Sequence, residues 1–193
     1  MRIVVWNARS AFSRKAAALA GLRPDIAVIP ECRRVTEASP GCSVWVGAIP
    51  SKGLAIMSYG HYRVTLAPDH EEEIRWAAPV LVTGPHSFFL LAIWEQRPYG
   101  TGVQRALARY GDLIKDGAAV VAGDFNQNAN WDRAGRARNH TRTVQMLGDL
   151  GLVSSYHHHF GEAQGKEALP TYWHSPTRKA LGFHIDYCFV PKQ

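Results

Sequence analysis

Short, uninterrupted apolar segments recur along the chain. They cover residues 26–29, 54–57, 88–94 and 118–122. Segments of this length, rich in Val, Ile and Ala and bounded by Gly, Pro or polar residues, are typical of strands buried on both faces. Further segments with the composition of strands cover residues 2–6, 62–66, 74–82 and 180–190. The pattern therefore predicts a protein built from many short strands.

The sequence indicates only a few helices. Apolar residues at helical spacing mark one helix from Phe12, stopped near Gly21, and another over residues 143–150. A longer helix begins near Thr101, where Thr101 and Gln104 have the spacing of a capping box, and ends near residue 117. Many strands with few helices favour sheets packed on each other with helices outside.

Composition and charge narrow the class of protein. The 193 residues fit one domain, and 46% hydrophobic with 20% charged residues excludes a disordered or fibrous chain. We expect a single domain over residues 1–193, with an exposed loop over 161–170. No apolar run approaches the ~20 residues of a membrane span, and the amino terminus lacks a signal-peptide pattern, so a cytoplasmic location is expected. The three cysteines, Cys32, Cys42 and Cys188, are expected to be reduced. A net charge of +6 favours polyanionic partners.

Polar residues stand at the ends of the predicted strands. They are Asn7, Glu31, the pair Asp124 and Asn126, and Asp186. Strand ends hold side chains rigidly, and carboxylate and amide oxygens are the ligands that Mg²⁺ prefers. Phosphoryl transfer needs a group that aligns or deprotonates water, and donors for the phosphate oxygens. Asp124 suits the first task, and the amides of Asn7 and Asn126 suit the second.

Each of these residues has a structural interpretation as well. Asn7 could cap the helix that begins near Ser10, Glu31 could be an exposed carboxylate, and residues 123–126 could form a turn closed by side chain-to-backbone hydrogen bonds. Asp186 is harder to explain structurally, because a buried carboxylate needs a partner.

The order of the motifs resembles a known family. Trp-Asn7, Pro-Asp-Ile-Ala-Val-Ile-Pro-Glu31, the segment 53–58, Gly-Asp-Phe-Asn126 and His-Ile-Asp186-Tyr are similar to the endonuclease/exonuclease/phosphatase superfamily over residues 1–190. The resemblance implies an α/β (α+β) four-layer sandwich of two mainly antiparallel sheets flanked by helices, with the active site at one edge. It implies Mg²⁺ or Mn²⁺ as cofactor, with Glu31, Asn7 and Asp124 at the metal. It also implies that Asp124 activates water, Asn126 donates to phosphate and Asp186 orients a catalytic histidine.

The chain departs from that family in three places. The family pattern ends in Ser-Asp-His, which residues 1–193 lack. We therefore interpret the chain as truncated before the last strand. We expect it to fold but to react ~10²–10⁴-fold more slowly than a chain carrying that segment. The His157–His159 run reads as a strand or loop and not as a metal site. Trp94 or Tyr99 takes the place of a tyrosine found in the nuclease branch, and Arg9 stands where abasic-site enzymes have an acidic or polar residue.

The predicted substrate is nucleic acid. Aromatic and arginine side chains together suit base stacking and phosphate contact, and the substrate-binding candidates are Arg9, Trp94, Tyr99, Arg133, Arg138 and His184. The chain would then be an endo- or exonuclease. One alternative is a phosphoesterase for a small phosphoester or lipid headgroup, and a second is a catalytically inactive binding module. The sequence carries no signal for an oligomeric state.

Overall fold

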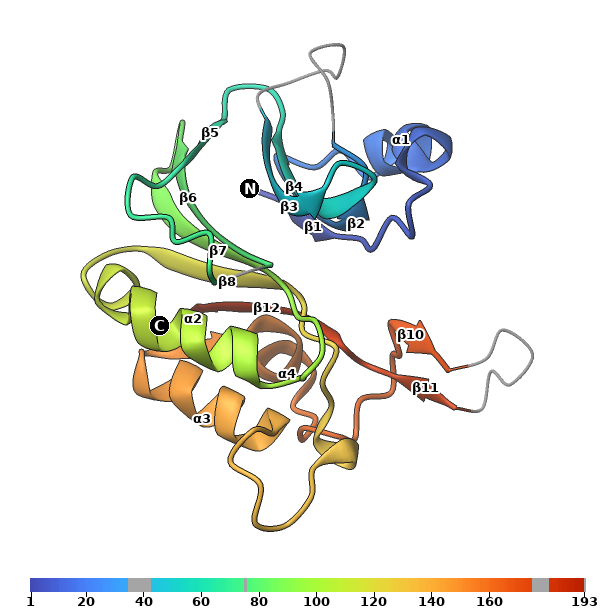
Figure 1. The fold of residues 1–193 in the computed structure, drawn as a ribbon, viewed down its shortest axis with the longest axis vertical. Coiled ribbons are helices and arrows are strands. Elements are labelled where there is room, and N and C mark those ends of the chain that lie inside the picture. Colours follow the sequence, from blue (N-terminus) through green and yellow to red (C-terminus); the bar gives the residue numbers. More distant parts are fainter. Residues whose placement is uncertain (35–42, 75, 175–180, 193) are drawn as a thin grey trace.

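The computed structural model describes residues 1–34, 43–74, 76–174 and 181–192. Cys42, and Arg75 within the predicted strand 74–82, lie outside the described residues. Two sheets pack face to face, with helices on their outer faces (Figure 1). None of the described helices combines the length and apolar character needed to cross a membrane.

The first sheet is formed by the amino-terminal part of the chain. Its strand order is β1-β2-β4-β3, and β1 is parallel to β2 while the other pairs are antiparallel. Helix α1 (Phe12–Gly21) covers its outer face through Leu19, which packs with Ile29 and Met57. The strand bounds are β1 Ile3–Val5, β2 Ile26–Cys32, β3 Ser43–Ile49 and β4 Lys52–Ser58.

The second sheet has six strands in the order β5-β6-β7-β8-β12-β9. Only the pair β7 and β8 is parallel. Helices α2 (Thr101–Lys115) and α3 (His140–Asp149) cover its outer face, and α4 (Ser155–Phe160) lies beside β12. The strands are β5 Arg63–Leu66, β6 Ala77–Thr83, β7 Phe88–Trp94, β8 Ala119–Asp124, β9 Leu152–Ser154 and β12 Asp186–Pro191.

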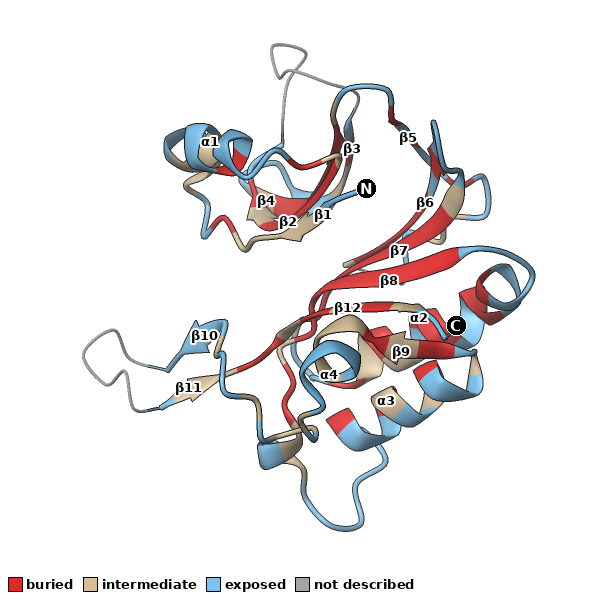
Figure 2. Cartoon of the chain, turned by 180° about the vertical axis from the view of Figure 1, so that it is seen from behind, coloured by how far each residue is buried: buried red, intermediate tan, exposed pale blue. Residues whose placement is uncertain are grey.

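The apolar strands explain the layered core. Val28 and Ile56 of the first sheet pack against Val80 and Leu90 of the second, while the other face of the second sheet packs on α2 and α3. Strands such as β7 and β8 are therefore covered on both sides, as Figure 2 shows by their buried colour. The prediction of a sandwich of two mainly antiparallel sheets with helices outside is confirmed.

Several local predictions were wrong. The His157–His159 run lies in α4 and not in a strand or loop. Strands β3 and β9 and a short η1 turn (Ala129–Trp131) were not predicted. Helix α3 begins at His140, three residues before the predicted start, because Asn139 Oδ1 accepts the backbone N–H of Arg142 and caps it.

The predicted strand over 180–190 is interrupted. Residues 182–183 pair with residues 172–173 in a small hairpin, and β12 starts only at Asp186. The hairpin strands β10 (Tyr172–Trp173) and β11 (Gly182–Phe183) project from the body of the molecule (Figure 1). Residues 161–170 form the predicted loop.

The amino terminus of α2 also differs from the prediction. The N-cap position is Gly100 in a left-handed conformation, and no side chain at that position accepts a hydrogen bond. Gln104 Nε2 donates to the backbone oxygens of Ala137 and Asn139, so no capping box forms with Thr101. Gly117 does not close the helix, whose C-cap is Asp116.

Candidate active site

An asparagine side chain joins the two sheets at one end of the sandwich. Asn7 follows β1, and its Nδ2 donates to Glu31 Oε1 at 3.2 Å and to Asp124 Oδ2 at 2.9 Å. Glu31 belongs to β2 and Asp124 ends β8, so these hydrogen bonds cross from one sheet to the other. Asn7 Oδ1 accepts the backbone N–H of Arg9 at 2.9 Å and does not cap α1, whose N-cap is Ala11. The structure thus brings Asn7, Glu31 and Asp124 together.

Glu31 lies on an irregularity of its strand. Its φ is 53°, and the register between β2 and β4 shifts between Ile29 and Cys32. A left-handed non-glycine residue costs about 1–3 kcal/mol, and such residues cluster at functional sites. A bulge re-aims a side chain that would otherwise follow the strand's alternation. Lys52 Nζ lies 3.2 Å from Glu31 Oε2, so this carboxylate oxygen forms an ion pair with the lysine side chain.

The Gly-Asp-Phe-Asn segment is both a turn and part of the site. Asp124 is the last residue of β8, and Asn126 has a φ of 48°. Asp124 Oδ1 accepts the N–H of Asn126 at 3.0 Å, while Asn126 Nδ2 donates to Glu95 O at 3.0 Å. The turn closed by side chain-to-backbone bonding is therefore present, and it aims Asp124 Oδ2 at Asn7.

Asp186 lies beside Asp124. The two residues are register partners in the antiparallel pair of β12 and β8. Among the described residues, no group hydrogen-bonds the buried Asp186 Oδ1. Burial raises the pKa of Asp186, and the charge of Asp124 raises it further, against a hydrogen bond from the Thr171 hydroxyl that lowers it. Asp186 therefore joins the cluster as a buried carboxyl group whose charged form is disfavoured.

These electrostatics fit a bound divalent cation. Burial raises the pKa of Asp124, as does nearby Glu31, while hydrogen bonds from Asn7 and Asn126 oppose the rise. The described part of the chain holds no group of three His, Cys, Asp or Glu residues arranged around one metal position. Mg²⁺ needs only one or two carboxylates, since it keeps several waters and binds substrate phosphate. Glu31 and Asp124 supply such carboxylates, and the Asn7 amide holds the two together.

A buried glutamate that sequence reasoning missed supports the site. Glu95 follows β7 and is 3% exposed. Its carboxylate accepts the backbone N–H groups of Gly102 at 3.0 Å and Val103 at 2.7 Å, and thereby caps α2. Burial raises its pKa to about 7, although those hydrogen bonds lower it. Its backbone N–H donates to Asp124 O at 2.8 Å. Glu95 therefore both caps α2 and contacts the backbone of Asp124. The signal for it in the sequence was a carboxylate directly after an apolar strand.

Two of the predicted substrate-binding residues, Trp94 and His184, are buried in the structure. Trp94 is 1% exposed and its ring lies edge-on to Trp76 with centroids 4.7 Å apart. His184 is 6% exposed, and its Nδ1 lies 2.9 Å from Leu169 O. Both side chains are used in packing, so neither is free to contact a substrate. The His184 ring also packs against Tyr156, with centroids 4.4 Å apart.

The other candidates for substrate binding are on the surface. Arg9, Tyr99, Arg133 and Arg138 are exposed. Tyr99, Arg133 and Arg138 line one cavity of about 620 Å³, which Asn126 also lines, whereas Arg9 does not. The cavity therefore adjoins the carboxylate cluster at Asn126.

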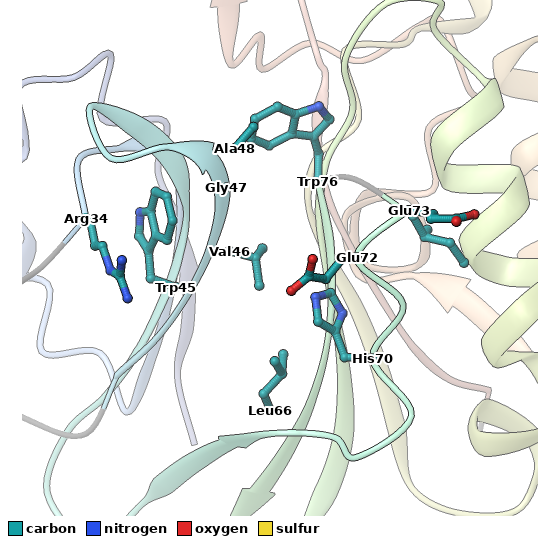
Figure 3. Close-up of a pocket in the computed structure, with 11 residues that line it drawn as sticks. Arg34, Trp45, Val46, Gly47, Ala48, Leu66, His70, Glu72, Glu73 and Trp76 are labelled. Carbon is teal, nitrogen blue, oxygen red and sulfur yellow. The ribbon is translucent and has the colours of Figure 1, made fainter.

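A second cavity, of about 520 Å³, lies between β3 and the segment that precedes β6 (Figure 3). Trp45 and Trp76 line it, together with Arg34, His70 and Glu72. Its lining combines acidic and basic residues, so it has no strong preference for a polyanion. None of its lining residues was predicted as a site residue.

His157 of α4 connects the helix to the loop over residues 161–170. His157 Nδ1 lies 2.7 Å from Ser154 Oγ, and His157 Nε2 lies 3.1 Å from Glu167 Oε1. Glu167 also accepts the N–H of Gly165 and a bond from Asn128, which ties the loop 161–170 to the body.

Similarity to solved structures defines the fold. The structure matches a 3′-5′ exonuclease from Neisseria meningitidis with a TM-score of 0.66 and 21% identity, over 99% of this chain and 87% of that one. It matches the endonuclease domain of TRAS1, a telomere-specific non-LTR retrotransposon, with a TM-score of 0.65 and 18% identity, over 99% and 85%. It also matches a Neisseria 3′ phosphatase bound to product DNA hairpin, with a TM-score of 0.67 and 19% identity, over 99% and 86%.

The chain therefore has the endonuclease/exonuclease/phosphatase fold. An AP endonuclease from Leishmania major shares it, with a TM-score of 0.67 and 14% identity, over 99% of this chain and 78% of that one. No protein-family profile matches the sequence, and no curated protein matches it significantly.

Proposed function

We propose that this chain hydrolyses phosphodiester bonds in nucleic acid, with Mg²⁺ or Mn²⁺ as cofactor. The observation that carries the proposal is the bridge from Asn7 to Glu31 and Asp124, with Asp186 beside it. The fold adds support, because similar structures include nucleases and a phosphatase bound to product DNA. The net charge of +6 favours a polyanionic substrate.

Each residue of the cluster has a distinct task in this proposal. Glu31 and Asp124 hold the cation, which neutralises charge on the phosphate oxygens. Asp124 also aligns the attacking water and accepts its proton, for which a raised pKa suits it. Asn126 Nδ2 has a second hydrogen beyond the one donated to Glu95 O, and donates it to a phosphate oxygen.

Asn7 acts through its neighbours. An amide nitrogen carries two hydrogens, and both hydrogens of Asn7 Nδ2 are engaged by Glu31 and Asp124. We therefore assign Asn7 to positioning the two carboxylates at the metal and not to contacting phosphate. Asp186 is a second carboxyl group beside Asp124, and burial together with the charge of Asp124 favours its protonated form.

A substrate panel tests the proposal. Fluorescent single-stranded DNA, duplex DNA and RNA, and bis(p-nitrophenyl) phosphate, are incubated with the chain in Mg²⁺, in Mn²⁺ and in EDTA. We expect cleavage of at least one nucleic acid with either metal and none in EDTA. Cleavage of the small phosphodiester alone would contradict the assignment of nucleic acid. Cleavage that continues unchanged in EDTA would contradict the metal dependence.

A further inference from the structure

The cavity beside Asn126 has the size of a ligand site. Its volume is about 620 Å³, within the 300–1,000 Å³ typical of small-molecule sites. It lies between the segment after β7 and the segment between β8 and α3. The residues that bear on its chemistry are Tyr99, Trp131, Asp132, Arg133, Arg136 and Arg138.

The cavity carries an uncompensated positive charge. Within the part of the chain that the structure describes, Arg133, Arg136 and Arg138 take part in no ion pair. The one acidic residue in the lining, Asp132, is already engaged. Its carboxylate accepts the N–H groups of His140 at 2.8 Å and Thr141 at 2.9 Å at the start of α3. The arginines are therefore available for an anion from outside.

The arginine segment is held in place by its backbone. Gln104 Nε2, from α2, donates to Ala137 O at 3.1 Å and to Asn139 O at 3.3 Å. Asn139 Nδ2 donates to Arg136 O, and Asn139 Oδ1 caps α3. A backbone segment held by such hydrogen bonds loses less conformational entropy when a ligand binds, which strengthens binding.

Two aromatic side chains offer stacking surfaces in the same cavity. Tyr99 is 42% exposed and Trp131 is 40% exposed. Trp131 is fixed by Phe183, with ring centroids 4.7 Å apart. Stacking of a base on an aromatic ring strengthens binding and is tolerant of base identity.

Two amide side chains in the lining, those of Asn128 and Gln127, form hydrogen bonds within the protein. Asn128 Oδ1 accepts the N–H of Asn130, while its Nδ2 donates to His184 O. Gln127 is buried and its Oε1 accepts from Thr143. These amides are the groups that would form paired hydrogen bonds with a base edge. The cavity therefore suits a ligand held by its negative charge and by stacking better than one recognised by hydrogen bonds to its base.

We propose that this cavity binds one terminal nucleotide of the substrate, with its phosphate on Arg133, Arg136 and Arg138 and its base against Tyr99 or Trp131. The inference rests on the proposed function and names the part of the substrate that the site selects. A base stacks on these rings only when it has left its own stack, so an unpaired end fits the cavity and an internal duplex nucleotide does not. The second cavity, with Glu72 and Glu73 in its lining, lacks this charge (Figure 3).

Binding of mononucleotides in EDTA tests the proposal without any need for catalysis. Titration calorimetry compares 5′-AMP, 5′-CMP, ribose 5-phosphate and adenosine on the wild type, on Arg133→Gln/Arg138→Gln and on Arg142→Gln. Arg142 is the matched control, because it is an exposed arginine of the neighbouring α3 that does not line the cavity. Tyr99→Ala tests the stacking surface, and thermal melts verify that each variant is folded.

We expect 5′-AMP and 5′-CMP to bind the wild type within about threefold of each other, and adenosine to bind at least about tenfold more weakly. The double arginine variant should lose about tenfold or more in nucleotide affinity, and Arg142→Gln should lose none. Tyr99→Ala should weaken 5′-AMP but not ribose 5-phosphate. Absence of 5′-AMP binding to the wild type, or equal binding by a folded double variant, would overturn the proposal. Hydrolysis without nucleotide binding would contradict only the proposal for this cavity. Nucleotide binding without hydrolysis would contradict only the proposed function.

Discussion

Glu95 should make the stability of the folded protein depend on pH. Its pKa rises from 4.5 to about 7 on folding because burial disfavours the charged carboxylate. A group whose pKa is raised by folding contributes stability below its unfolded pKa, and this stability is lost as the pH rises through the folded pKa. The window is therefore pH 4.5 to about 7. The difference corresponds to about 3 kcal/mol of unfolding free energy.

The variant Glu95→Gln isolates this contribution. Gln keeps one acceptor oxygen but turns an N–H₂ group toward one of the two helix N–H groups that Glu95 accepts. Near pH 4.5 we expect the variant to be about 1 kcal/mol less stable than the wild type, because one hydrogen bond is lost. By pH 8 Glu95 of the wild type is ionised in the folded protein, where burial disfavours its charge, so the variant should be about 2 kcal/mol more stable.

Urea denaturation in EDTA at half-unit steps from pH 4.5 to 8 measures both free energies of unfolding. Asp124 and Asp186 also have raised pKa values, but they titrate in both proteins and cancel in the difference. The sign of the stability difference should reverse within this range. A difference that stays constant within about 0.5 kcal/mol would refute the reasoning, since Glu95 would then titrate at its ordinary pKa in the folded protein.

Three further predictions concern the site and its supports. Titration should show that Mn²⁺ binds the wild type weakly and binds Glu31→Gln at least about tenfold more weakly still. The exposed control Glu73→Gln should bind Mn²⁺ as the wild type does. Equal binding by the wild type and Glu31→Gln would exclude Glu31 as a ligand. Gly123→Ala should destabilise the fold by about 3 kcal/mol or more, because its φ is 152° and an added Cβ would lie 1.9 Å from Ile93 O. A urea midpoint equal to that of the wild type would contradict this. Asp132→Ala should cost about 1–2 kcal/mol by uncapping α3, and a loss below about 0.3 kcal/mol in the same assay would show that the cap is dispensable.

The sequence predicted the layered fold because the strands are buried on both faces. Segments such as 88–94 carry no polar residue that would face solvent, and this pattern requires a cover on each side of the sheet. Strand β3 was missed because it is an edge strand, in which Trp45 lies across Gly47 and Gly53 and the alternation is weak. The α4 helix was missed because its six residues carry no helical apolar pattern.

The site was predictable in its residues but not in its geometry. Asn7, Glu31 and Asp124 each follow an apolar strand, which is visible in the sequence. The left-handed conformations of Glu31 and Asn126, and the contact of Lys52 with Glu31 beside the irregularity between β2 and β4, have no signal in the sequence. The burial of Trp94 was not predictable, because a single aromatic residue at a strand end looks the same in the sequence whether it faces a cleft or the core.

The rate of metal-dependent hydrolysis by Asp124→Asn tests the central claim most directly. Asn preserves the size of the side chain and can still accept the N–H of Asn126, but it removes the charge and the proton acceptor. On whichever labelled nucleic acid the wild type cleaves, we predict that the Mn²⁺-dependent rate falls by about 10²–10⁴-fold in a folded variant. If wild-type hydrolysis depends on the metal and Asp124→Asn hydrolyses the substrate in Mn²⁺ at the wild-type rate, the account is contradicted. A wild type with no metal-dependent hydrolysis would contradict it as well.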